Sequence, residues 1–275
     1  MNTRQARQKA PRYALLGAVA LYSVVPLLSM FSAAIMPQSV IPEGLNFTLH
    51  PQWHNFVAAW SLANMTTLLK SSVLLVLGVV PVAVLISTLA AYAIAVLEIP
   101  LGKLFYFVLL LTLALPFEIV VIPLYFQDQS MGLLDSRWGL VLPLIGLNMP
   151  FAVFWMRSHF VNMPRELFEA GSVDGASSWQ LFRRVHLPLA QPALASLGLL
   201  MFLSTWNQFL LPLVLMSNPN EWTLAGALQT FQNKYGTNEV LLAAGAVELM
   251  APTIIVYLVL QRHFIKALIQ GAVKG

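Results

Sequence analysis

The side chains that could do chemistry gather in one polar stretch, which runs from Glu169 to Pro188 between long apolar segments. Its two acids are Glu169 and Asp174. Metal-dependent transfer chemistry would need further aspartates at helical spacing to hold the metal. Residues 177–192 contain no acid at all. The acids of this stretch therefore predict no metal site, and their role has to be found in another kind of interaction.

Other catalytic chemistries are excluded by what the sequence lacks. There is no cysteine, so thiolate catalysis, disulfides and cysteine-ligated metals cannot operate. No phosphate-binding loop occurs, because Lys70-Ser71 follows no glycine-rich stretch. His50 and His54 lie beside tryptophans, which favours a headgroup interface or a docking surface over a metal site. We predict no catalytic residue, no metal and no cofactor in this chain.

Composition places the chain in a membrane. Hydrophobic residues make up 58% of the 275 residues and charged residues 9%, with a mean hydropathy of +0.74, which leaves too little polar surface for a soluble globule. A span needs about 20 apolar residues. The sequence predicts an all-α polytopic protein whose transmembrane domain, residues 13–261, has six spans. These are residues 13–35, 71–96, 104–125, 139–158, 193–216 and 241–261.

Basic residues set the predicted orientation, because cytoplasmic loops carry the excess of Lys and Arg. With the N-terminus inside, 12 of the 15 basic residues fall in inner segments. We therefore predict cytoplasmic ends at residues 1–12 and 262–275. Because the basic residues are dispersed, a nucleic-acid partner is not expected. A signal peptide ending near Ser32-Ala33-Ala34 is the alternative for the first span, although its apolar run is longer than a usual one.

The segment at 159–192 is the only sizeable predicted inner loop, and its sequence carries the start and stop signals of two short helices. Glu166 and Glu169 follow Pro164, as suits a helix start. Gly175 then breaks the helix, and Ser177 with Gln180 predicts a capping box for a second one. Apolar side chains on both helices would suit a groove on a soluble partner; they are Leu167, Phe168, Leu181 and Phe182. A solvated linker is the alternative.

Polar side chains inside the predicted spans form a second candidate site. Placing such groups in the hydrocarbon core costs free energy, so their presence there favours a functional role. With nearby aromatic residues they could line an outward-facing cavity suited to a sugar. Interhelical hydrogen bonds within the bundle, or with a partner permease, explain them equally well. The candidate pathway residues are Glu118, Tyr125, Trp206, Asn207, Gln208 and Glu248.

Eight residues between 169 and 188 follow one spaced pattern: Glu169, Ala170, Asp174, Gly175, Ala176, Val185, Leu187 and Pro188. The pattern resembles the cytoplasmic EAA motif of permease subunits in bacterial ABC importers. Gly171 departs from the alanine that is usual at its position.

Further blocks extend the resemblance from about residue 70 onward. They are similar to the carbohydrate-uptake branch of these permeases, the maltose-type G subunit family, although Lys70-Ser71 departs from its usual Asn-Ser. The blocks are Ala90-Ala91-Tyr92-Ala93, Pro116, Ile122-Pro123-Leu124-Tyr125, Gly132-Leu133-Leu134-Asp135, Trp206-Asn207, Pro212-Leu213, Thr223-Leu224 and the tail from Phe264.

The resemblance implies a type I ABC importer permease in the bacterial inner membrane, which itself hydrolyses nothing. Implied partners are a second permease, ATPase subunits that carry ATP and Mg, and an extracytoplasmic solute-binding protein. The loop would dock on an ATPase subunit, with Glu169 facing a basic residue there. The implied coupling residues are Glu166, Glu169, Ala170, Asp174, Gly175, Ala176, Leu187 and Pro188.

Other functions remain as alternatives. Within ABC importers the substrate could be glycerol phosphate or another polar solute in place of a sugar or oligosaccharide. A secondary transporter is a weaker rival, because no pair of broken-helix repeats and no charged relay is evident. A CDP-alcohol phosphotransferase would need the metal-holding aspartates that residues 177–192 lack.

Overall fold

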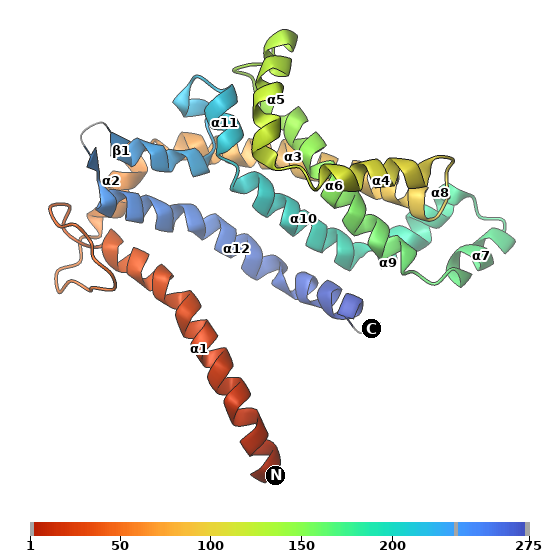
Figure 1. Cartoon of the computed structure of the whole chain (residues 1–275), viewed down its shortest axis with the longest axis horizontal. Helices are drawn as coiled ribbons and strands as arrows, with labels where there is room; N and C mark the ends of the chain where they lie inside the picture. Colours follow the sequence, from red (N-terminus) through yellow and green to blue (C-terminus); the bar gives the residue numbers. More distant parts are fainter. Residues whose placement is uncertain (1–2, 234–235, 273–275) are drawn as a thin grey trace. The chain divides into compact units, whose positions relative to one another are not determined.

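The structure is a computed structural model that describes residues 3–233 and 236–272. It is helical almost throughout, as predicted (Figure 1). The α-helices are α1 (Thr3–Ala34), α2 (His54–Leu62), α3 (Met65–Ala95), α4 (Gly102–Thr112), α5 (Phe117–Met131), α6 (Arg137–Val161), α7 (Glu166–Val173), α8 (Ser178–Leu181), α9 (Leu187–Leu189), α10 (Gln191–Trp206), α11 (Leu210–Leu215) and α12 (Glu239–Ala272). The other elements are the π-helix η1 (Phe182–His186), the 3-10 helices η2 (Pro219–Glu221) and η3 (Leu224–Phe231), and the paired two-residue strands β1 (Gln232–Asn233) and β2 (Gly236–Thr237).

The chain divides into two compact units. The smaller unit contains the chain up to Thr66 together with Ala227–Ala251. The larger unit contains Thr67–Gly226 and the chain from Pro252 onward. The 159–192 loop and all the candidate pathway residues except Glu248 belong to the larger unit.

Long apolar helices supply the predicted spans. Among the described residues, four helices (α1, α3, α6 and α12) are long and apolar enough to cross a membrane, with mean hydropathies of 1.7 to 2.7. Two bent helix pairs raise the number to 6 if each pair is one span. Four of the six predicted spans thus correspond to unbroken helices, whereas the third and fifth predicted spans coincide only in part with the two bent pairs.

The third predicted span, residues 104–125, is not one straight helix. Helices α4 and α5 meet at an angle of 103° across residues 113–116. Pro116 precedes α5 with an extended ψ of 132°. Proline has no N–H to continue the helical ladder and disfavours helical geometry in the residue before it. Hydropathy detects the apolar length of this span but not the proline-induced bend.

The fifth predicted span, residues 193–216, is also interrupted. Helix α10 starts two residues earlier, at Gln191, and ends at Trp206; a second short helix, α11, follows after a break. At its other end, α10 makes a bend of 73° with the preceding helical segment Ser178–Leu189. Pro192 follows this bend and cannot donate a hydrogen bond to the carbonyl of Pro188 four residues earlier, which explains the bend there.

The core of the larger unit joins α3, α6 and α10 to the segment α8–η1. Helix α6 packs against α4 and α10 (Figure 1). One buried cluster, which includes Tyr92, Met156, Phe160, Phe182 and Leu197, lies among these elements. A second cluster joins α5, α6 and α11. Both clusters therefore connect transmembrane helices to the segments that carry the candidate sites.

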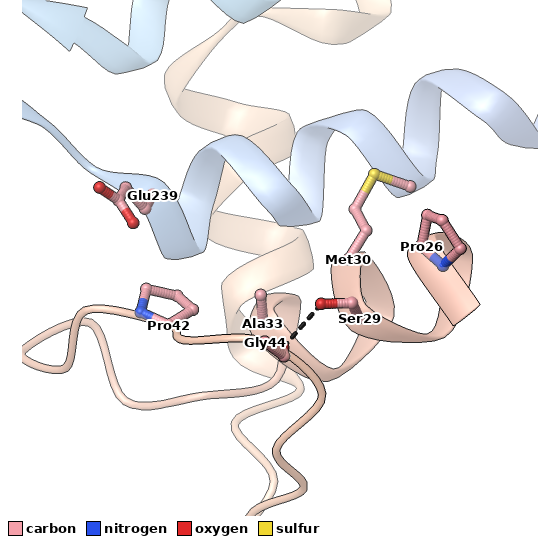
Figure 2. A pocket seen from close by; sticks show the side chains of 7 residues that line it. All are labelled: Pro26, Ser29, Met30, Ala33, Pro42, Gly44 and Glu239. Carbon is pink, nitrogen blue, oxygen red and sulfur yellow. Dashed lines mark hydrogen bonds between the residues drawn. The ribbon is translucent and has the colours of Figure 1, made fainter. Parts of the chain in front are cut away.

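The smaller unit is held by side-chain hydrogen bonds around the end of α1, one donor lying in α2 and the other in α1. The buried Asn55 amide donates to the carbonyls of Ala34 and Met36, at 2.9 and 2.8 Å. Figure 2 shows Ser29 donating its hydroxyl hydrogen to the Gly44 carbonyl, at 2.6 Å, beside a pocket of about 360 Å³. These bonds fix the segment after α1 to its own unit. The pocket is lined by Pro26, Ser29, Met30, Ala33, Pro42, Gly44 and Glu239.

Candidate functional site

The first helix of the 159–192 loop ends in a glycine turn, as predicted. Helix α7 begins at Glu166, two residues after Pro164, and Gly175 follows it with a φ of +77°. The Ala176 N–H donates to the Gly171 carbonyl at 3.0 Å, and the Gly175 N–H donates to the Ser172 carbonyl at 3.1 Å. These two bonds define a Schellman motif, in which glycine takes the left-handed position without steric cost. Gly175 thereby reverses the chain between α7 and α8.

The predicted capping box at the start of α8 is confirmed. The Gln180 N–H donates to the Ser177 hydroxyl oxygen at 3.3 Å, and the Ser177 N–H donates to the Gln180 side-chain oxygen at 2.8 Å. The box satisfies two amide groups that a helix start leaves free. Helix α8 then runs into the π-helix η1, which the sequence did not predict.

Four aromatic side chains anchor the second half of the loop to the transmembrane helices. This aromatic anchor consists of Tyr92 from α3, Phe160 from α6, and Phe182 and His186 from η1. The Tyr92 ring lies 5.7, 4.8 and 5.2 Å from the rings of the other three. Aromatic pairs at such distances add stability beyond the area they bury. The anchor therefore fixes η1 at the ends of α3 and α6.

Hydrogen bonds complete this anchor. The Tyr92 hydroxyl donates to the Ser178 carbonyl at 3.1 Å. His186 is only 2% exposed, and its Nδ1 lies 3.3 Å from the Leu181 carbonyl oxygen. His186 was not singled out in the sequence, because nothing local distinguishes it from a solvated loop histidine. Tyr92 stood in a family block, but its contact with the loop joins residues 86 positions apart.

Helix α7 is held by fewer contacts. Phe168 lies 6.3 Å from the His186 ring, and a Cβ at Gly171 would meet the Leu181 Cδ2 atom. The missing methyl group at Gly171, where the family usually has alanine, gives room to the buried Leu181 side chain. An exposed ion pair of 3.2 Å joins Arg165 to Glu98 in the segment between α3 and α4. Such a pair contributes about 0–1 kcal/mol.

The opposite face of α7 is open. Glu166, Glu169 and Ala170 are exposed, and Val173 is 87% exposed. Among the described residues, no ion pair or hydrogen bond engages the side chain of Glu169. The side chain of Leu167 lies outside the described residues. Farther along the loop, Asp174 and Pro188 are exposed, whereas Ala176 and Leu187 are half-buried.

The break after α10 places three candidate pathway residues where the helical ladder is interrupted. Pro212 cannot donate to the Gln208 carbonyl, and the Thr223 hydroxyl donates to it instead, at 2.6 Å. The Gln208 side-chain oxygen accepts from the Leu210 N–H at 3.2 Å. Broken helices at membrane depth are tolerated where other groups satisfy the backbone. Asn207 remains exposed at the end of α10.

The remaining candidate pathway residues differ in their surroundings. Trp206 is 3% exposed and stacks on Phe202, with ring centroids 5.4 Å apart. Glu118 is exposed in the first turn of α5, and Tyr125 is half-buried in the same helix. No hydrogen bond or ring contact in the described part of the chain joins these three residues. Glu248 lies in the smaller unit, half-buried in α12.

A polar pair in the larger unit was missed in the sequence. Asn148 in α6 is buried and donates to the Leu144 carbonyl at 2.7 Å. Ser204 in α10 donates its hydroxyl hydrogen to the Asn148 side-chain oxygen at 3.1 Å. Asn148 lies in the predicted span 139–158, so the rule that singled out Asn207 would also have found it. Among the described residues, no three potential ligands group to hold a metal.

Several known proteins that are similar to this chain are permeases. A diacetylchitobiose uptake system permease of Streptomyces coelicolor is 31% identical over 268 residues, which cover 96% of this chain and 89% of the relative. An arabinooligosaccharides transport system permease of Halalkalibacterium halodurans is 32% identical over 94% of this chain and 93% of the relative. An sn-glycerol-3-phosphate transport system permease of Yersinia pestis is 31% identical over 90% of each chain.

Solved structures agree with these relatives. A bacterial ABC transporter involved in the import of the acidic polysaccharide alginate matches with a TM-score of 0.77 and 25% identity, over 96% of this chain and 99% of the other. The MetNI methionine ABC transporter matches in fold, with a TM-score of 0.57 and 16% identity over 76% and 94%. Residues 83–270 match the model of one family. The chain belongs to the family of binding-protein-dependent transport system inner membrane components.

Proposed function

We propose that this chain is a permease subunit of an ATP-driven importer and that it translocates a sugar or oligosaccharide. A solute-binding protein would deliver the substrate, and a second permease would complete the transmembrane pathway. ATPase subunits would hydrolyse ATP with Mg. The names of the diacetylchitobiose and arabinooligosaccharides relatives support this substrate class. The excess of basic residues in the inner segments supports cytoplasmic termini.

The observation that carries the proposal is the contrast within the 159–192 loop. The exposed acidic face of α7, with Glu166 and Glu169, projects from a segment that the aromatic anchor ties to α3 and α6. A partner that binds α7 can therefore push or pull on the transmembrane helices. We assign the docking role to α7, with Glu169 as its charged contact and Asp174, Gly175 and Ala176 forming the turn. Leu187 and Pro188 connect η1 to α10.

Affinity purification of the tagged chain from its native membrane in mild detergent, followed by mass spectrometry, tests the proposal. We expect a second permease, an ATPase subunit and, under crosslinking, a solute-binding protein. A chain that reproducibly purifies alone, or only with itself, would favour a secondary transporter and overturn the proposal.

We propose that the broken end of α10 contributes to the substrate pathway. Asn207 and Gln208 supply hydrogen-bonding groups there, and Tyr125 and Trp206 supply aromatic faces; Glu118 and Glu248 are further polar candidates. Because Asn207 is exposed, Asn207→Ala should lower substrate uptake without lowering the amount of assembled transporter. Glu43→Ala, at an exposed position in the smaller unit, is the control. Equal uptake by the Asn207 variant and the wild type would remove Asn207 from the pathway.

A phosphorylated substrate is the second candidate, because the glycerol-phosphate permease of Yersinia pestis has the same 31% identity to this chain as the diacetylchitobiose permease. Such a substrate would require a cation in the pathway, and the candidate pathway residues include none. Competition between labelled oligosaccharides and glycerol phosphate for uptake separates the two substrate classes.

A further inference from the structure

A pocket lined by none of the proposed coupling or pathway residues lies on the anchored half of the 159–192 loop. Its volume is about 400 Å³, and it is lined by Trp179, Gln180, Arg183 and Arg184. All four side chains are exposed, so the pocket is open to the surroundings. It lies on α8 and η1, after the glycine turn that separates these elements from the proposed ATPase-docking helix α7.

The two arginines of this pocket have no acidic partner. Across the described residues, the one ion pair found is that between Arg165 and Glu98. Residues 177–192 contain no acid. Two neighbouring guanidinium groups without a counter-ion repel each other, and an anion in the pocket would relieve this repulsion. The pocket therefore has the charge of an anion-binding site.

The geometry of the pocket is fixed by the buried aromatic residues on which its lining packs. The Trp179 ring is 61% exposed and stacks on the buried Phe182 ring, with centroids 5.3 Å apart. Phe182 in turn belongs to the aromatic anchor. The arginines belong to the π-helix η1, and π-helical turns are frequent at functional sites. The lining is thus presented on a rigid base.

The pocket lies beside the ends of α3 and α6, two helices long and apolar enough to cross a membrane. Tyr92 lies three residues before the end of α3, and Phe160 lies one residue before the end of α6. The bond from the Tyr92 hydroxyl to the Ser178 carbonyl holds Trp179, the next residue, at the same level. Beyond the arginines, Pro188 and Leu189 are exposed and lead into α10. Exposed tryptophan and apolar side chains beside basic residues are typical of the headgroup region.

We propose that Trp179, Arg183 and Arg184 bind the phosphate group of an anionic phospholipid at the cytoplasmic surface of the membrane. Arginine suits this ligand because its planar guanidinium donates two parallel hydrogen bonds to phosphate oxygens. Basic pockets at the cytoplasmic ends of transmembrane helices attract anionic lipids. The assignment to the cytoplasmic leaflet rests on the proposed function, which places this loop inside the cell. Lipid bound here would hold η1, and with it the base of α7, at the membrane surface.

Native mass spectrometry of the purified full-length chain tests this site. The chain is titrated with phosphatidylglycerol and, separately, with phosphatidylcholine. For Arg183→Gln/Arg184→Gln we expect about 25-fold weaker binding of phosphatidylglycerol, because each arginine contributes about fivefold, or about 1 kcal/mol. Phosphatidylcholine binding should not change. Lys103→Gln removes an exposed charge from another predicted inner segment and should leave both lipids bound as in the wild type.

The double lysine variant, Arg183→Lys/Arg184→Lys, keeps the charge and should retain most of the binding, which excludes misfolding as the cause. Unchanged phosphatidylglycerol binding in the glutamine variant would overturn the proposal. Equal competition by inorganic phosphate would identify a soluble phosphate ligand and overturn the lipid assignment. Loss of ATPase-subunit binding with intact lipid binding would assign the arginines to a protein partner instead. Because the lipid titration uses this chain alone, its outcome is independent of the test of the proposed function.

Discussion

The two halves of the 159–192 loop differ in how they are attached to the rest of the chain. The second half, α8 with η1, has buried Phe182 and His186 side chains and a hydrogen bond to Tyr92. The first half, α7, presents exposed carboxylates and is connected through the Gly175 turn. The anchored half, α8 with η1, is thus a rigid base, and α7 is its exposed tip. This arrangement suits the transmission of a partner's movement, because a flexible base would absorb that movement. The anchored half is therefore as important to the proposed coupling as the half that carries Glu169.

Truncating a side chain of the aromatic anchor, which fixes the α8–η1 half, should have the largest effect. Phe182→Ala deletes a buried ring of the aromatic anchor, and such truncations cost about 3–5 kcal/mol. We expect a large loss of thermal stability, measured by melting of the purified protein in detergent. Val173→Ala changes an apolar residue of the exposed tip and should melt within the error of the wild type. Equal melting of both variants would mean that the two halves do not differ in attachment.

Straining the turn between the halves should have an intermediate effect. Gly175 has a φ of +77°, and an alanine there costs about 1–2 kcal/mol. Gly175→Ala should therefore misplace α7 and reduce the co-purification of the ATPase subunit. Gly175→Asn is the matched variant, because asparagine tolerates this conformation better. If alanine supports co-purification as well as glycine, the turn does not set the position of α7.

Removing the N-terminal cap of α8, where the anchored half begins, should have the smallest effect. Ser177→Ala removes the capping box of α8, which costs about 1 kcal/mol. Hydrogen exchange of the α8 amides should become about fivefold faster. Ser172→Ala, which removes a hydroxyl bond to the Phe168 carbonyl within α7, should leave exchange in α8 unchanged. Equal acceleration in both variants would show that the loop opens as one unit.

The local features of the loop could be predicted because local bonds determine them. The Gly175 turn and the Ser177–Gln180 capping box each connect residues within five positions of one another. The apolar length of the spans was likewise evident from composition. The attachment of the loop could not be predicted, since the Tyr92 to Ser178 bond joins distant segments. No spacing rule links a tyrosine in one span to a backbone carbonyl in a later loop.

The helix breaks show a different limit. Pro116 and Pro212 were visible in the sequence, but proline also occurs inside α3, α6 and α12. The break before Pro212 is stabilised by the Thr223 hydroxyl, which arrives from a later segment. Whether a proline bends a helix or ends it thus depends on which distant group satisfies the freed carbonyl. The Asn148–Ser204 bond is likewise a contact between helices that only the packing reveals.

The most direct test of the coupling role is Glu169→Ala in the assembled transporter, reconstituted in lipid with its solute-binding protein and substrate. The measurement is substrate-stimulated ATP hydrolysis together with the amount of ATPase subunit retained. Because Glu169 is exposed, we expect an unchanged melting temperature but weaker ATPase-subunit retention and lower stimulated hydrolysis, with Glu43→Ala behaving as the wild type. Wild-type retention and stimulation in the Glu169 variant would contradict the assignment of α7 as the coupling contact.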